Sequence, residues 1–206
     1  MVWPVGAVSK KSPEQRNAEL LKAALPALQT LCIEHPAELA RSAHGHAVLF
    51  ETIAATQRSA AAGVDADTDA LPVLQALAIA STSDGDGEGD LALPLVRHYV
   101  AARLLKRLIK QGDNFAELLL AQMRGALVQW SMDGAAWVVL ALLEAQVTSA
   151  HVSKELAPAL SEIESSDADG CRTLSAALKP LVGETPSKLK AGKIASSKKK
   201  AADKKM

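Results

Sequence analysis

Apolar residues recur along most of this chain at the three- and four-residue spacing of amphipathic helices, whereas the two-residue alternation typical of strands is nearly absent. Short polar turns rich in Gly, Pro, Ser and Asp separate these apolar runs. The pattern therefore predicts an all-α protein. The predicted helices start at Pro13, at about Ala37 and before Val48, and then run over 69–80, 91–110, 115–123, 125–130, 135–146, 149–163 and 170–181. The stretch 91–110 is either one helix or two helices separated near Pro94.

The first helix has the clearest start signal. Ser12 is a good N-cap residue, Pro13 suits the first helical position, and an acidic residue follows at Glu14. We expect Pro26 to kink or restart this helix, because proline cannot donate the backbone hydrogen bond of a helix interior. Four apolar positions mark the face expected to pack inward: Leu20, Leu21, Ala24 and Leu28.

A small residue that opens an aliphatic run recurs four times, at Gly45, Ala101, Gly134 and Gly170, at intervals of 56, 33 and 36 residues. Helical units at this period are typical of an α-solenoid, in which each unit buries its apolar face against its neighbours. We predict an N-terminal extension over 1–8, a helical-repeat domain over 9–183 with an acidic loop at 81–90, and a tail over 184–206.

Charge is distributed unevenly, although the chain has 23 basic and 23 acidic residues. From residue 187 onward it has eight lysines and one acid, hence a net charge of +7, which leaves −7 for the other 186 residues. Such a tail has little apolar surface to bury, so we predict that it is disordered. Its lysines favour a nuclear or nucleolar address or phosphate binding, and the alternative is a solubilising tail. The candidate contacts are Lys188, Lys190, Lys193, Lys198, Lys199 and Lys200.

Two further basic clusters are candidates for phosphate contact. The first has five basic residues within 14 positions: Arg97, Arg103, Lys106, Arg107 and Lys110. The second, weaker cluster lies near the N-terminus and consists of Lys10, Lys11, Arg16 and Lys22. The alternative for both is a solvated helix face, because long basic side chains commonly cover apolar surface with their stems.

Three blocks of the sequence resemble the Puf-A branch of the Pumilio-homology proteins, at their C-terminal CPL domain. The first block is Ser9-Lys10-Lys11-Ser12-Pro13-Glu14 with Arg16 and Glu19-Leu20-Leu21, and the second runs from Val96-Arg97-His98 to Leu104-Leu105-Lys106-Arg107-Leu108-Ile109. The third runs from Phe115-Ala116-Glu117 through Trp130 to Trp137-Val138-Val139-Leu140-Ala141-Leu142-Leu143-Glu144. The resemblance covers roughly residues 7–181.

The resemblance implies a Pumilio- or armadillo-like helical-repeat protein of the nucleolus that binds RNA or DNA with little base specificity. It also implies a role in ribosome biogenesis and rRNA processing, translational regulation in some members, and rRNA precursors, mRNA and pre-ribosomal proteins as partners. The chain departs from the family pattern at Asp133-Gly134, where an arginine is missing, and at Ala102, where a histidine is missing. Pumilio repeats read one base each with two or three side chains. The corresponding positions Ala47, Arg103 and Ala136 do not form such a code.

Several function classes find no support in the sequence. Six aromatic residues are few for a surface on which bases stack. Sequence motifs typical of catalysis or of loops that bind phosphate are absent. The acidic loop lacks the glutamate that an EF-hand needs, and Cys32, His35, His44 and His46 make a weak zinc set. Cys32 and Cys171 lie far apart, which favours a reducing compartment. No apolar run reaches about 18 residues, so we expect no membrane contact.

We therefore expect a non-enzymatic, monomeric RNA-binding protein without a cofactor. A second hypothesis is a protein-interaction scaffold, because the body without the tail is acidic. A third is an incomplete fragment whose function needs further repeats.

Overall fold

A computed structural model describes residues 11–61, 69–85 and 88–183, and every regular element within these ranges is helical. The predicted N-terminal extension, with Lys10, and the predicted tail, with its lysines, lie outside the described residues. The helices are α1 (Pro13–Glu34), α2 (Pro36–Arg41), α3 (Ala43–Ala61), α4 (Leu71–Thr82), η1 (Gly89–Leu91), α5 (Tyr99–Gln111), α6 (Asp113–Met123), α7 (Leu127–Trp130), η2 (Ser131–Ala135), α8 (Ala136–Glu144), α9 (Gln146–Leu156), η3 (Ala157–Ala159), α10 (Leu160–Ser165) and α11 (Cys171–Gly183).

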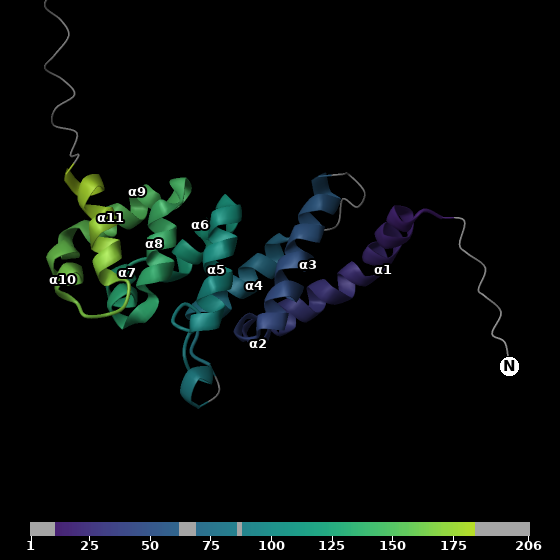
Figure 1. The fold of residues 1–206 in the computed structure, drawn as a ribbon, viewed down its shortest axis with the longest axis horizontal. Helices are drawn as coiled ribbons and strands as arrows, with labels where there is room; N and C mark the ends of the chain where they lie inside the picture. The colour runs from purple at the N-terminus through teal and green to yellow at the C-terminus, as the bar shows by residue number, and fades with distance from the viewer. Residues whose placement is uncertain (1–10, 62–68, 86–87, 184–206) are drawn as a thin grey trace, which may run out of the picture.

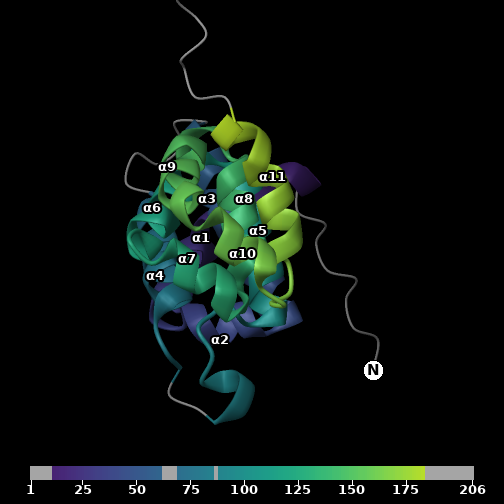
Figure 2. The ribbon, with the colours of Figure 1, turned by 90° about the vertical axis from the view of Figure 1, so that its left-hand side faces the viewer.

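These helices are arranged in two layers. In the first layer, α1 packs on α3, α3 on α5, α5 on α8 and α8 on α11. In the second, α2 packs on α4, α4 on α6 and α6 on α9. Along the long axis of the protein, α1 lies at one end and α10 and α11 lie at the other, with α5 between them (Figure 1). Seen along that axis, α4, α6 and α9 lie on one side and α5, α8 and α11 on the other (Figure 2).

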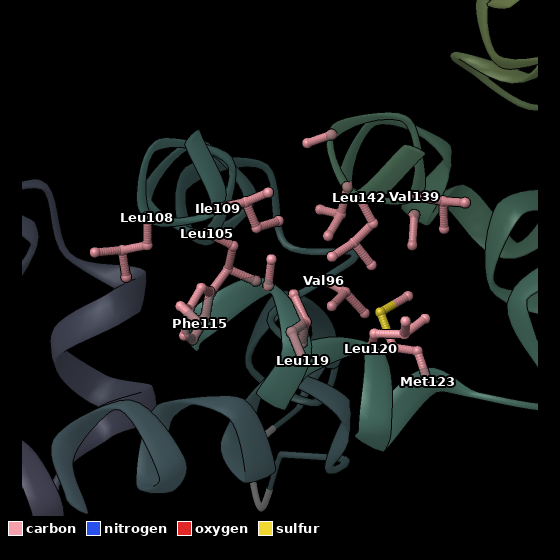
Figure 3. Packing of buried hydrophobic residues seen from close by; sticks show 14 of the residues in the cluster. Val96, Leu105, Leu108, Ile109, Phe115, Leu119, Leu120, Met123, Val139 and Leu142 are labelled. Carbon is pink, nitrogen blue, oxygen red and sulfur yellow. The ribbon is translucent and has the colours of Figure 1, made fainter. Parts of the chain in front are cut away.

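Aliphatic side chains between the layers form one core. Leu105 of α5, Leu119 of α6 and Leu142 of α8 are fully buried and belong to the same cluster (Figure 3). Each comes from a helix whose apolar residues recur at three- and four-residue spacing, so each helix presents one apolar stripe to the opposite layer. Periodicity in the sequence therefore predicted the all-helical class correctly.

The start of α1 confirms the predicted cap. Ser12 Oγ accepts a hydrogen bond from the Gln15 amide at 3.2 Å, and Gln15 Oε1 accepts one from the Ser12 amide at 3.3 Å, which completes a capping box. The predicted restart at Pro26 is wrong, because α1 continues through this residue without interruption. Pro26 and Lys22, whose carbonyl loses its helical partner, are both exposed, so water can satisfy that carbonyl.

The predicted inward face of α1 is also wrong in its first half. Leu20 is 64% exposed, and Leu21 and Ala24 are exposed as well, whereas Leu25 and Cys32 are buried. The reason is the position of α1 at the end of its layer, where α3 is its neighbour on one side and no described helix of that layer follows on the other, although α4 and α2 of the second layer also contact it. An apolar stripe along α1 is left uncovered by the described residues.

Two predicted helices are shortened or divided at a proline. The helix predicted over 91–110 begins only at Tyr99, because the chain makes turns through Pro94 while burying Leu95 and Val96. The helix predicted over 149–163 is divided into α9, η3 and α10 around Pro158. In both cases proline interrupts the backbone hydrogen bonding at the point of division.

Leu127–Glu144 is an 18-residue helical stretch with a mean hydropathy of 1.2, which by length and composition is sufficient to cross a membrane. The expectation that no stretch reaches this length is therefore wrong. However, 56% of this stretch is buried inside the protein, and Gly134 interrupts it with a φ of 100°. These features are typical of a core helix.

Candidate nucleic-acid interface

Helix α5 separates its apolar and basic residues onto opposite sides. Leu104, Leu105 and Leu108 are buried, whereas Arg103, Arg107 and Lys110 are exposed. The helix starts at Tyr99 with His98 as N-cap, and His98 Nδ1 accepts a hydrogen bond from the Ala101 amide at 3.3 Å. We use the name α5 face for the outward residues of this helix together with the rings beside them: Phe50, Tyr99, Arg103, Lys106, Arg107, Lys110 and Trp137.

Three cations of the α5 face lie over aromatic rings. The Arg103 guanidinium is 4.4 Å from the centroid of the Tyr99 ring and also donates a hydrogen bond to the Tyr99 hydroxyl. The Lys106 ammonium is 5.6 Å from the Trp137 ring centroid. The Arg107 guanidinium is 3.3 Å from the centroid of Phe50, which is only 7% exposed. Basic side chains of α5 thus contact one ring in its own first turn, one in α3 and one in α8.

The same three cations have no carboxylate partner among the residues that the structure describes. Lys110 differs, because its Nζ lies 3.5 Å from the Glu144 carboxylate of α8. A guanidinium that stacks flat on a ring keeps its N–H groups at its edge, where they can bind an anion. The α5 face therefore presents positive charge that is ordered by ring contacts and not neutralised by acids.

Arg97, the remaining member of the predicted cluster, lies in the turn before α5 and is exposed. No salt bridge in the described part of the chain includes it. The structure thus brings all five predicted residues to one region of the protein, although Arg97 precedes the helix.

The second predicted cluster is not part of this surface. Lys11 forms an ion pair with Glu19 at 2.7 Å, and Arg16 donates a 3.4 Å hydrogen bond to the Lys11 carbonyl. Both residues lie at the start of α1, at the opposite end of α1 from its neighbour α2, and α3 separates α1 from α5 in the layer (Figure 1). A ligand at the α5 face would therefore not reach the start of α1 without extending past α3.

The sequence did not predict the three rings of the α5 face, of which Phe50 is buried and the other two are exposed. Tyr99 is 71% exposed and Trp137 is 37% exposed, although the low aromatic content had argued against a stacking surface. For Tyr99 a signal was available, because Tyr99 and Arg103 are four residues apart and so share one side of a helix. Trp137 begins an aliphatic run that predicts core packing, and its exposure follows only from the arrangement of α5, α8 and the turn before α11.

Among the residues that the structure describes, burial shifts the pKa of two groups. It lowers the pKa of His98, and the positive charge of Arg41 lowers it further, so the neutral ring that caps α5 is favoured. Burial also raises the pKa of the Cys32 thiol, which disfavours the thiolate that zinc requires. No group of three or more His, Cys, Asp or Glu side chains that could hold a metal ion is found among the described residues.

A family model of the CPL (NUC119) domain matches residues 5–118. This match covers more than half of the chain. The chain belongs to the CPL (NUC119) domain family. This is the domain family of Puf-A-like proteins, so the predicted resemblance is confirmed at the level of the domain.

The CPL match includes α5, with Tyr99, Arg103 and Lys106, and ends within α6. Trp137 and the rest of α8 lie beyond it, as does most of the third block on which the resemblance was based. Comparisons with curated proteins and with solved structures gave no match.

Proposed function

We propose that this CPL-family protein binds RNA largely independently of sequence and acts in nucleolar ribosome biogenesis, in rRNA processing and in translational regulation. The observation that carries the proposal is the α5 face, where three cations lie over aromatic rings and have no acidic partner in the described residues. Phosphate is the anion that such a row of cations fits, because Arg edges and Lys ammonium groups contact phosphate oxygens along a backbone. DNA offers the same phosphates, so we expect it to bind too.

The two-layer arrangement supports an α-solenoid of Pumilio- or armadillo-like repeats. Each of α3, α5 and α8 packs on its predecessor in the same layer and on a helix of the other layer. In such a stack, equivalent helices present equivalent faces along one side of the protein. A ligand that runs along the stack would cross α3, α5 and α8 in turn, which suits an extended polymer.

Sequence-independent binding follows from the residues at the equivalent helix positions. Ala47 and Ala136 are too short to reach the edges of bases, which leaves Arg103 as the one long side chain of the three. Contacts to phosphate carry no sequence information. We further infer a binding role without catalysis, a monomeric state, and a nuclear address in the lysine-rich residues 184–206.

A salt titration with charge variants tests the proposal. We expect Arg103→Gln, Lys106→Gln and Arg107→Gln together to weaken RNA binding and to lower the slope of log affinity against log salt by about two to three units, since each phosphate contact contributes about one. The full chain should be used, and a version ending at Thr185 shows how much affinity the tail adds.

A matched control removes the same charge elsewhere. Lys154→Gln, Arg172→Gln and Lys179→Gln together remove three cations outside the α5 face, on α9 and α11. We expect this variant to leave most of the slope unchanged. Equal effects of both triple variants would show that RNA responds to the total charge of the protein and not to the α5 face. Loss of all binding in the truncated chain would place RNA binding in the tail. Either result would overturn the proposal.

One observation favours the second candidate, a protein-interaction scaffold. The uncovered stripe of α1 exposes Leu20 at 64% and Leu31 at 40%, and soluble surfaces rarely display large apolar side chains in a row without a partner. If a pre-ribosomal protein docks there, Leu20→Glu with Leu31→Glu will prevent co-sedimentation with pre-ribosomal particles while RNA affinity in isolation is unchanged.

A further inference from the structure

Two exposed aromatic rings flank the cations of the α5 face. Tyr99 lies in the first turn of α5 and is 71% exposed, whereas Trp137 lies in the first turn of α8 and is 37% exposed. Each ring has a basic side chain of α5 beside it: Arg103 beside Tyr99 and Lys106 beside Trp137. An aromatic ring next to a cation is the pairing that single-stranded nucleic acid uses, with a base on the ring and its phosphate on the cation.

Trp137 is held in place by the turn before α11. Its Nε1 donates a hydrogen bond to Asp169 Oδ2 at 2.9 Å. The next residue, Gly170, has a φ of 85°, and a Cβ added there would lie 3.1 Å from atoms of the indole. The close approach of this glycine and the bond to Asp169 fix the ring orientation before any ligand binds. A fixed ring loses little conformational entropy when a base stacks on it.

Burial of a ring under a basic side chain explains only some of the cation–ring contacts of the α5 face. Phe50 is buried under Arg107, so that pair is explained by the burial of a ring under a basic side chain. Tyr99 and Trp137 keep substantial exposed surface although their neighbouring cations are long enough to cover them. The exposed part of each ring is therefore not used by packing among the described residues.

We propose that unpaired bases of single-stranded RNA stack on Trp137 and Tyr99 while Lys106 and Arg103 bind the adjoining phosphates. This inference rests on the proposed function, and it adds a preference for single strands over duplexes. In a duplex the bases are stacked on one another and their faces are inaccessible, so only the phosphates reach the α5 face. When a base stacks, the Lys106 and Arg103 side chains swing from above the rings towards the phosphates.

Affinities of ring variants for a single strand and for a duplex of equal length test this proposal. We expect Trp137→Leu to weaken binding of single-stranded RNA by about 5-fold to 100-fold, the range seen when a stacking side chain is removed. Duplex binding should change by less than about 2-fold, and the salt slope should stay the same for both ligands, because no charge is removed. Trp137→Phe keeps a stacking face without the Asp169 bond and should restore most of the single-strand affinity.

Tyr99→Leu provides a second test that cannot disturb the core, because the ring is so exposed. We expect it to lower single-strand affinity selectively, and Tyr99→Phe to leave that affinity nearly unchanged. Equal weakening for single strands and duplexes by both leucine variants, or no weakening by either, would overturn the stacking proposal. Such a result would leave the proposed function intact if the triple charge variant still lowers the salt slope. An unchanged slope in that variant would instead overturn the proposed function itself.

Discussion

Helices α5 and α1 lie in the same layer. Within that layer α5 has a neighbour on each side, α3 and α8, whereas α1 has α3 alone among the described helices, and its other contacts are with α4 and α2 of the second layer. All the leucines that α5 turns inward are covered, and its outward residues are polar or aromatic. On α1, Leu20 and Leu31 remain exposed beside the buried Leu25. The comparison shows that an apolar stripe in a helical stack is buried only where a neighbour is present to cover it.

The strongest expected contrast between the two helices is in stability. Leu105→Ala in α5 should lower the free energy of unfolding by about 2–5 kcal/mol, because it removes a fully buried side chain from the core. Leu20→Ala in α1 should change it by less than about 0.5 kcal/mol, since most of that side chain is already in water. Urea unfolding monitored by circular dichroism measures both values. A large loss for Leu20→Ala would mean that the α1 stripe is covered in solution.

A second contrast concerns how far the loss of a cap spreads. Ser12→Ala removes the capping box of α1 and should destabilise the first turns of that helix by about 1 kcal/mol. Because this part of α1 is exposed, we expect faster amide exchange in its first turns without a comparable loss of global stability. Hydrogen exchange measured by mass spectrometry shows this, and Ser12→Asp, which keeps a capping oxygen, serves as the control.

The comparison also explains which features sequence could predict. Helix starts at Ser12 and the basic residues of α5 follow from local spacing, so both were predictable. The exposure of Leu20 and of Trp137 depends on which helices lie beside them, and periodicity carries no information about that. Trp137 is ordered by Asp169 and Gly170, 32 and 33 residues further along the chain. The family match to residues 5–118 covers α5 but not this tryptophan.

A third, smaller effect concerns charge on the two helices. Glu144→Gln removes the carboxylate beside Lys110 and should change stability by at most about 1 kcal/mol, because the pair is exposed. We expect it to raise the salt slope of RNA binding by about one unit, since Lys110 becomes available to a phosphate. Salt titrations as above measure this slope.

Glu19→Gln is the matched variant on α1, because it also removes a carboxylate from an exposed ion pair with a lysine. Since the start of α1 lies outside the α5 face, the slope should change less than for Glu144→Gln. Equal increases would mean that RNA responds to net charge and does not distinguish α5 from α1.

The smallest expected effect concerns the N-caps of the two helices. The stability that the histidine cap of α5 contributes depends on pH, whereas that of the serine cap of α1 does not. Burial and the charge of Arg41 lower the pKa of His98 from its usual value of 6.5, so the unfolded chain takes up the proton at a higher pH than the folded protein does. The contribution of this cap is therefore fully present above pH 6.5 and is lost as the pH falls below that value towards the lowered pKa.

Protonation also turns Nδ1 of His98 from an acceptor into a donor, which breaks its hydrogen bond with the Ala101 amide. The charge of Asp90 opposes this shift in the pKa of His98, and the charge of His46 adds to it. His98→Asn keeps a capping oxygen that does not titrate, and the fall in Tm from pH 7 to pH 5 should be smaller in this variant than in the unaltered protein. An identical fall would show that the cap of α5 is as insensitive to pH as the serine cap of α1.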